Sequence, residues 1–199
     1  MDFLAIGLFS ISAIALLGSP GPAIAALIAV GRAEGLGRGI RYYTGLQVGL
    51  AAAAGISAVG LFSMIKALPS ALQAMTALAT VYLIFLAYKI ATSPVGAAVA
   101  QRSTPSSAKA GFLLGMTNPK AFVAFATLFA SRTLMGANPQ GDLALKWTLC
   151  VIVMIVVDFA WLLVGAALHQ ATLSPGKERA LNLCLATAIL LAAAMSFVV

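Results

Sequence analysis

Two side chains of opposite charge lie inside otherwise apolar stretches of this sequence. Lys120 falls within the stretch 110–131 and Asp158 within 147–168, each near the middle. An ionisable group at that depth in a bilayer costs several kcal/mol unless it is paired or hydrated. We therefore expect Lys120 and Asp158 to face one another or to share a cavity. Three interpretations remain open. The two residues form a static ion pair, or the Lys120 side chain extends to the membrane interface, or Asp158 exchanges protons and its proton affinity depends on how close Lys120 lies.

Proline-containing runs interrupt two of the apolar stretches. Gly18-Ser19-Pro20-Gly21-Pro22 lies within the uncharged run 3–31, and Asn118-Pro119-Lys120 lies within 110–131. Each proline lacks a backbone donor and clashes with the carbonyl one turn earlier, which breaks a helix. Because lipid offers no partner for the freed carbonyls, such breaks must face protein or a polar cavity. Many secondary transporters hold their substrate at discontinuous helices of this kind.

One amide, Gln47, lies between Gly45 and Gly49 in the uncharged run 42–65. Glycines at four-residue spacing predict close helix packing in lipid. A buried amide needs a partner, so Gln47 either bonds a neighbouring helix or lines a solute path. The predicted substrate-binding residues come from the two breaks and this amide: Ser19, Pro20, Gly21, Pro22, Gln47, Asn118, Pro119 and Lys120. The predicted proton-coupling residues are Asp158 and Lys120.

The composition indicates an integral membrane protein. The chain has 199 residues, of which 62% are hydrophobic and only 9% are charged, whereas soluble domains carry about 25% charged residues. About 20 apolar residues suffice to cross a bilayer as a helix. We predict an all-α membrane protein with six transmembrane helices. They are expected in the uncharged runs and the two singly charged stretches: 3–31, 42–65, 67–88, 110–131, 147–168 and 180–199.

The two halves of the chain resemble one another. Leu16-Leu17-Gly18 lies four residues before Pro22, and Leu113-Leu114-Gly115 lies four residues before Pro119. Three helices precede and three follow the polar stretch 92–109, so the halves would insert with opposite orientation. We predict two inverted three-helix repeats, residues 1–91 and 110–199, joined by a cytoplasmic linker over 92–109, with the first and fourth helices broken.

The net charge of +7 reflects membrane topology rather than nucleic-acid binding. Basic residues concentrate between the first and second, third and fourth, and fifth and sixth predicted helices. The positive-inside rule places those connections in the cytoplasm and both termini outside. The first of them is predicted to be a tight, glycine-rich basic loop over 31–41. Six helices leave a thin wall around a central path, which makes a homodimer plausible.

Other kinds of chemistry have little support in the sequence. No Cys-x-x-Cys pair exists, and a divalent-metal site needs more oxygen or soft ligands than one acidic residue supplies. We predict no metal and no cofactor. Catalysis is not expected, because Asp158 and His169 lie about 16 Å apart along one helix. A channel or transporter for an inorganic cation or another small solute remains the alternative to a carrier of organic solutes, and a membrane scaffold is a further one.

The motifs resemble those of a known family. The Gly18-Ser19-Pro20-Gly21-Pro22 break, Val30-Gly31-Arg32 with its basic surroundings, and Gly115 with Asn118-Pro119-Lys120-Ala121 are similar to the lysine exporter (LysE) superfamily, most closely its homoserine/threonine-resistance (RhtB) branch. This resemblance implies an exporter of amino acids or close derivatives in the inner membrane, driven by the proton gradient. The family commonly has Asn after the Ser-Pro-Gly-Pro run, where this chain has Ala23.

Overall fold

The computed structural model describes residues 2–60, 69–92, 107–136, 138–170 and 174–195. Within those ranges the chain is helical, with no strand. The all-helical prediction is therefore confirmed for the described part of the chain. The helices are α1 (Phe3–Gly18), α2 (Pro22–Ala58), α4 (Pro69–Ala91), α5 (Ala108–Thr117), α6 (Pro119–Phe129), α7 (Pro139–Gln170) and α8 (Pro175–Met195).

Sharp bends occur at both proline-containing runs. α1 and α2 meet at 62° and α5 and α6 at 55°, each across a short break. Pro22 and Pro119 take the first helical positions of α2 and α6, where the missing N–H would have no helical partner in any case. The prolines thus end one helix and begin the next.

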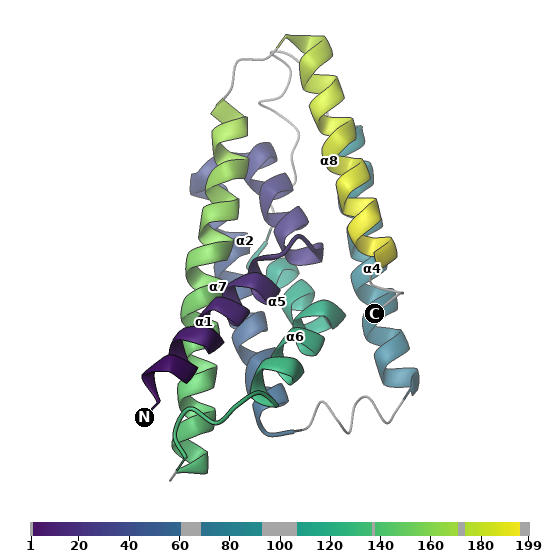
Figure 1. Ribbon diagram of the computed structural model, residues 1–199. Coiled ribbons are helices and arrows are strands. Elements are labelled where there is room, and N and C mark those ends of the chain that lie inside the picture. Colours follow the sequence, from purple (N-terminus) through teal and green to yellow (C-terminus); the bar gives the residue numbers. More distant parts are fainter. Residues whose placement is uncertain (1, 61–68, 93–106, 137, 171–173, 196–199) are drawn as a thin grey trace.

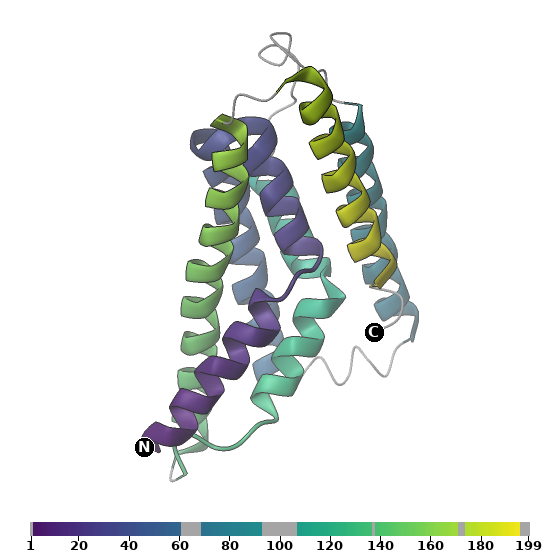
Figure 2. The ribbon, with the colours of Figure 1, turned by 45° about the horizontal axis from the view of Figure 1, so that its top comes forward.

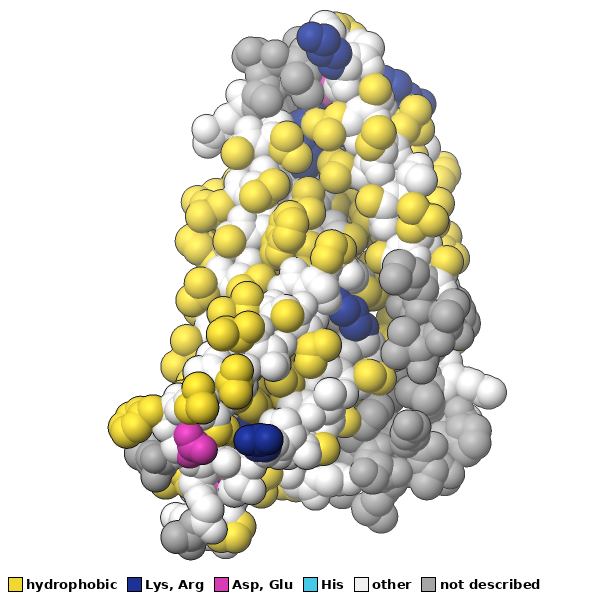
Figure 3. All heavy atoms as spheres, viewed as in Figure 1, with side chains coloured by type: hydrophobic (Ala, Val, Ile, Leu, Met, Phe, Trp, Pro, Cys, Tyr) yellow, Lys and Arg dark blue, Asp and Glu magenta, His cyan; other side chains and the backbone are white. Residues whose placement is uncertain are grey.

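In the part of the chain that the structure describes, one helix, and two bent helix pairs if each is counted as one span, have the length and composition needed to cross a membrane. Among the described residues, α7 alone is long and apolar enough to cross a bilayer as a single helix, and the count rises to three if each bent pair is one span. Large hydrophobic side chains such as Ile11, Val81 and Val156 are exposed, and hydrophobic side chains cover much of the face in Figure 3. An exposed surface of this kind suits a lipid environment.

The predicted loop over 31–41 is wrong. α2 continues through this segment, and only Gly35 departs from helical geometry, with φ of 70° and ψ of −178°. A positive φ is readily adopted only by glycine. The chain therefore reverses at one residue, and the two arms of α2 form a helical hairpin (Figure 2). The predicted linker 92–109 falls mostly on 93–106, outside the described residues, and the division into two repeats stays a prediction.

The arms of α2 pack at the centre of the bundle, against α7 and α5, while α4 and α8 run side by side next to them (Figure 1). Glycines allow the closest contacts. A Cβ on Gly45 would lie 1.9 Å from the carbonyl oxygen of Ala108, and one on Gly111 would lie 2.2 Å from that of Tyr42. The glycine motifs of α2 and α5 therefore pack against each other, backbone to backbone.

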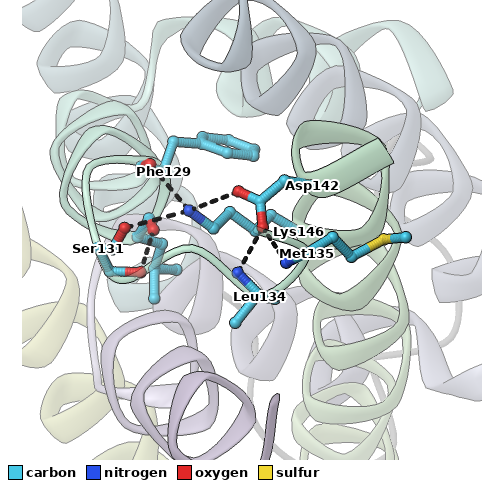
Figure 4. A network of polar contacts seen from close by, with 7 residues as sticks. Phe129, Ser131, Leu134, Met135, Asp142 and Lys146 are labelled. Carbon is cyan, nitrogen blue, oxygen red and sulfur yellow. Dashed lines mark hydrogen bonds and ion pairs between the residues drawn. The ribbon is translucent and has the colours of Figure 1, made fainter. Parts of the chain in front are cut away.

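A buried polar network ties the start of α7 to the end of α6 (Figure 4). The Asp142 carboxylate accepts from the backbone N–H groups of Leu134 and Met135, the latter at 2.8 Å, and pairs with Lys146 at 3.1 Å. The Lys146 ammonium also donates to the carbonyls of Phe129 and Ser131, both at 3.2 Å. Each buried charge thus has several partners, which offsets its loss of hydration.

A second polar cluster joins helices at the opposite end of α7. Arg32 of α2 pairs with Glu178 of α8 at 3.0 Å. The ring nitrogen Nδ1 of His169, near the end of α7, lies 2.8 Å from the carbonyl oxygen of Arg32. The His169 ring also packs against Gly35, where a Cβ would lie 3.1 Å from it. Three helices are therefore linked at the corner of the α2 hairpin.

The backbone contact at Gly45 leads to a stability prediction. Gly45→Ala forces α2 and α5 apart, and overpacking of this kind costs about 1–3 kcal/mol. Gly37→Ala, on the same helix, meets nothing within 4 Å and gains about 0.5–1 kcal/mol of helix propensity. Thermal unfolding in detergent should therefore shift downward for Gly45→Ala and not for Gly37→Ala. Equal midpoints for the two variants would contradict the packing described.

Candidate functional site

The two helix breaks meet through one side chain. Lys120, in the first turn of α6, donates from Nζ to the carbonyl oxygens of Ser19 and Pro20, the second at 3.1 Å. These carbonyls lie in the break between α1 and α2, where helical partners are missing. The ammonium therefore supplies hydrogen bonds to carbonyls that the interruption of the helix leaves without backbone partners. It also connects residues about one hundred positions apart, from the two halves of the chain.

Gly21 makes room for this contact. A Cβ at that position would lie 2.7 Å from Cδ of Lys120 and 3.0 Å from Nζ. The backbone of Gly21 is extended, with φ of −173° and ψ of −173°, so space rather than conformation requires glycine here. The lysine stem passes directly over the break.

Asp158 approaches the same region from α7. It is 3% exposed, and its Oδ2 accepts a hydrogen bond of 2.8 Å from Nε2 of Gln47 on α2. The predicted interhelical bond of Gln47 is therefore present, and its partner is the buried acid. Asp158 and Lys120 line one cavity without forming a direct ion pair.

That cavity is polar on one side and small. Its volume is about 30 Å³, which is room for about two water molecules. Its polar lining comes from Ser19, Asn118, Lys120 and Asp158. These polar groups come from four places: the break before α2, the break before α6, α6 itself and α7. We call this space the polar cavity.

Asn118 lines the polar cavity and has an unpartnered amide oxygen. It is 3% exposed, and its Oδ1 has no hydrogen-bond partner. Asn118 is the N-cap residue of α6, yet its side chain does not cap the helix, and Gly21 at the start of α2 has no side chain that could. The first N–H groups of both helices thus remain without side-chain partners. Uncapped helix N-termini attract anions.

The remaining predicted residues surround this arrangement. Pro22 and Pro119 are buried at the first positions of α2 and α6. Pro20, Gly21, Pro22 and Lys120 also border a second, more apolar space beside α8. Seven of the eight predicted substrate-binding residues therefore lie at the junction of the two breaks, and Gln47 is connected to it through its hydrogen bond to Asp158. Their role in binding stays a prediction.

Several apolar residues of the polar cavity were missed by sequence reasoning. Ile24, Leu50, Ala124 and Met154 line it beside the polar groups. No motif marks them, because a Leu or Met in a membrane helix looks alike whether it faces lipid or a cavity. Among the described residues, no group of three or more His, Cys, Asp or Glu side chains could hold a metal ion.

Comparisons with known proteins agree with the motifs. A model of the family described as LysE type translocator matches residues 14–199, which is most of the chain. No curated protein matches, and no solved structure matches. The family comprises membrane transporters rather than enzymes, in keeping with the apolar helices and the absence of a predicted catalytic group. The predicted superfamily is confirmed, and the chain belongs to the LysE type translocator family.

Proposed function

We propose that this protein exports amino acids or close derivatives from the cytoplasm, in exchange for protons and by alternating access. The observation that carries the proposal is the junction of two broken helices through Lys120, beside the buried Asp158. Carriers commonly bind substrate at such discontinuous helices near the middle of the membrane. Membership of a translocator family supports transport, and the site supports a solute with both a carboxylate and an ammonium group.

The carboxylate would bind at the helix starts. The N-termini of α2 and α6 provide N–H groups without side-chain caps and the positive ends of two helix dipoles. Lys120 adds a full positive charge between them. A carboxylate arriving there competes with the carbonyls of Ser19 and Pro20 for the same ammonium. Binding of the solute would therefore loosen the connection between the two helix breaks. In this way the presence of solute in the site would be coupled to movement of the helices.

The ammonium group would bind at the acceptor groups of the polar cavity. The Oδ1 atom of Asn118 is an acceptor without a donor, and Asp158 offers a negative charge with one hydrogen bond from Gln47. The two acceptors line the same space. The carbonyls of Ser19 and Pro20, a further candidate for the ammonium, are occupied by Lys120 in this conformation.

Asp158 is the proposed proton carrier. A carboxyl group that is buried among apolar helices changes between two energetically distinct states when it gains or loses a proton. When the ammonium of the solute leaves, a proton neutralises Asp158 and permits the return step. Gln47 holds the carboxylate toward the cavity in the deprotonated state.

The proposed architecture completes the scheme. Six spans in two inverted three-helix repeats would relate the α1–α2 break to the α5–α6 break, and the two bends have similar angles. We further propose an inner-membrane location with the basic connections in the cytoplasm, both termini outside, an RhtB-like affiliation and a homodimeric assembly. Rocking of one repeat against the other would expose the polar cavity alternately to the two sides.

The test of export uses purified protein in liposomes. Vesicles loaded with one labelled amino acid at a time are diluted into buffer that imposes a pH gradient, and efflux is compared with protein-free vesicles. We expect gradient-dependent efflux of at least one amino acid. Protein-free rates for all twenty would refute amino-acid export, and gradient-driven flux of an inorganic cation in the same vesicles would favour the alternative carrier.

Asp158→Asn separates proton coupling from binding. Asparagine keeps the size and the acceptor for Gln47 but cannot exchange a proton. We expect proton-driven net efflux to fall by at least about tenfold, as befits loss of a required proton carrier, while exchange of internal for external solute continues. Asp2→Asn is the matched control, because Asp2 caps α1 at the surface and asparagine caps equally well. Full proton-coupled flux in Asp158→Asn would refute the proposed role.

Gly21→Ala tests the Lys120 connection. The added methyl group would displace the lysine stem from the carbonyls of Ser19 and Pro20. We expect efflux to drop by at least about tenfold, the scale of a misplaced binding group, with the protein still folded in detergent. Gly7→Ala, which meets nothing within 4 Å on α1, should behave as the parent. Unchanged efflux in Gly21→Ala would show that the lysine contact is dispensable.

A further inference from the structure

An apolar groove opens on the other side of Lys120. It lies between the first arm of α2 and α8, and its volume is about 360 Å³. The walls include Ile24 and Ile28 of α2, Trp161 of α7, and Ala188 and Leu191 of α8. We call this space the apolar groove. It is more than ten times larger than the polar cavity, which holds about 30 Å³.

The groove and the polar cavity are adjacent and share lining residues. Gly21, Ile24 and Lys120 border both spaces. Among the described residues that line the groove, Lys120 alone is charged, and it lies where the groove reaches the helix break. A solute whose carboxylate contacts this ammonium therefore has two neighbouring spaces available. Only the larger one accommodates more than a small polar group.

The lining decides which side chains suit that larger space. Apart from Lys120 and Trp161, the described residues that line it have aliphatic side chains or none. A hydroxyl or ammonium group placed there would lose water without gaining an acceptor, which costs free energy. An aliphatic or aromatic side chain would instead gain from leaving water. A cationic side chain would additionally be repelled by Lys120.

We propose that the apolar groove is the side-chain subsite of the exported solute, and that the protein carries α-amino acids with large apolar side chains, such as leucine and phenylalanine. This inference rests on the proposed function and names the substrate class of the same site. The α-carboxylate lies at Lys120, and the side chain extends from there between α2 and α8. Lysine and threonine, whose side chains end in polar groups, are poor substrates.

The experiment compares the efflux of different amino acids and tests a variant in which a larger side chain narrows the groove. Liposomes with the full-length protein are loaded separately with labelled leucine, phenylalanine, alanine, lysine or threonine, and the internal concentration for half-maximal efflux is measured. Ala188→Phe narrows the groove from an exposed position on α8, and Ala194→Phe adds the same ring at an exposed position outside it. Leucine and phenylalanine should leave at lower concentrations than lysine or threonine.

The variants should separate large from small side chains. Ala188→Phe is expected to raise the half-maximal concentration for leucine about tenfold, the scale of lost pocket contacts, and that for alanine by less than about twofold. Ala194→Phe should change neither.

Three outcomes would overturn the inference. Lysine or threonine transported as well as leucine would exclude an apolar subsite. Equal impairment of leucine and alanine by Ala188→Phe would indicate that the groove holds a lipid chain or serves packing. Absence of efflux for every amino acid would refute the proposed function itself, and is thereby distinguished from the first two outcomes.

Discussion

The structure depends on how backbone carbonyls are satisfied where helices break inside an apolar bundle. Between the end of α1 and the start of α2 the chain is not helical, so backbone carbonyls are left there that lipid cannot hydrogen-bond. The Lys120 ammonium occupies this position and donates to Ser19 and Pro20. A mobile ion could do the same, but a lysine is permanently attached to α6. The Lys120 side chain therefore stabilises the break between α1 and α2, and the two carbonyls in turn stabilise the buried ammonium. Because Lys120 belongs to α6, the same contact holds the α5–α6 break against the α1–α2 break.

Glycines set the distances at which this contact is possible. Gly45, Gly49, Gly111 and Gly115 bring α2 and α5 into backbone contact, and Gly31 and Gly165 do the same for α2 and α7. Because α2 is held on both sides, α7 and the α6 helix that follows α5 bring their cavity residues to it with little freedom. Asp158 can then reach Gln47, and Lys120 can reach the break. Close packing is thus a condition for the polar contacts rather than a separate feature.

The sequence predicted well the positions at which a polar group or a helix break costs free energy in lipid unless it has a partner. The two breaks, Gln47, Lys120 and Asp158 stand out because prolines, amides and charges need partners in lipid, and the structure gathers them around one cavity. It predicted poorly the positions where placing a residue in lipid or in protein costs little free energy. The apolar residues that line the cavity follow no sequence pattern. The loop predicted over 31–41 is a helix with one hinge: of its glycines, Gly35 alone adopts a positive φ, while Gly31, Gly37 and Gly39 lie in helix. The partner of Lys120 was also not evident, since an acid and a base at similar depth suggest an ion pair more readily than a lysine on carbonyls.

The network of Asp142 and Lys146 bears on how the chain enters the bilayer. The two residues lie one turn apart on α7 and pair at 3.1 Å. Since their spacing is set by the helix itself, they can neutralise one another as soon as that turn forms, without contacts from any other helix. The beginning of α7 then presents no net charge from these two residues to the membrane during insertion. Docking of the α6 end afterwards adds the backbone partners, so biogenesis and final stability draw on the same pair in succession.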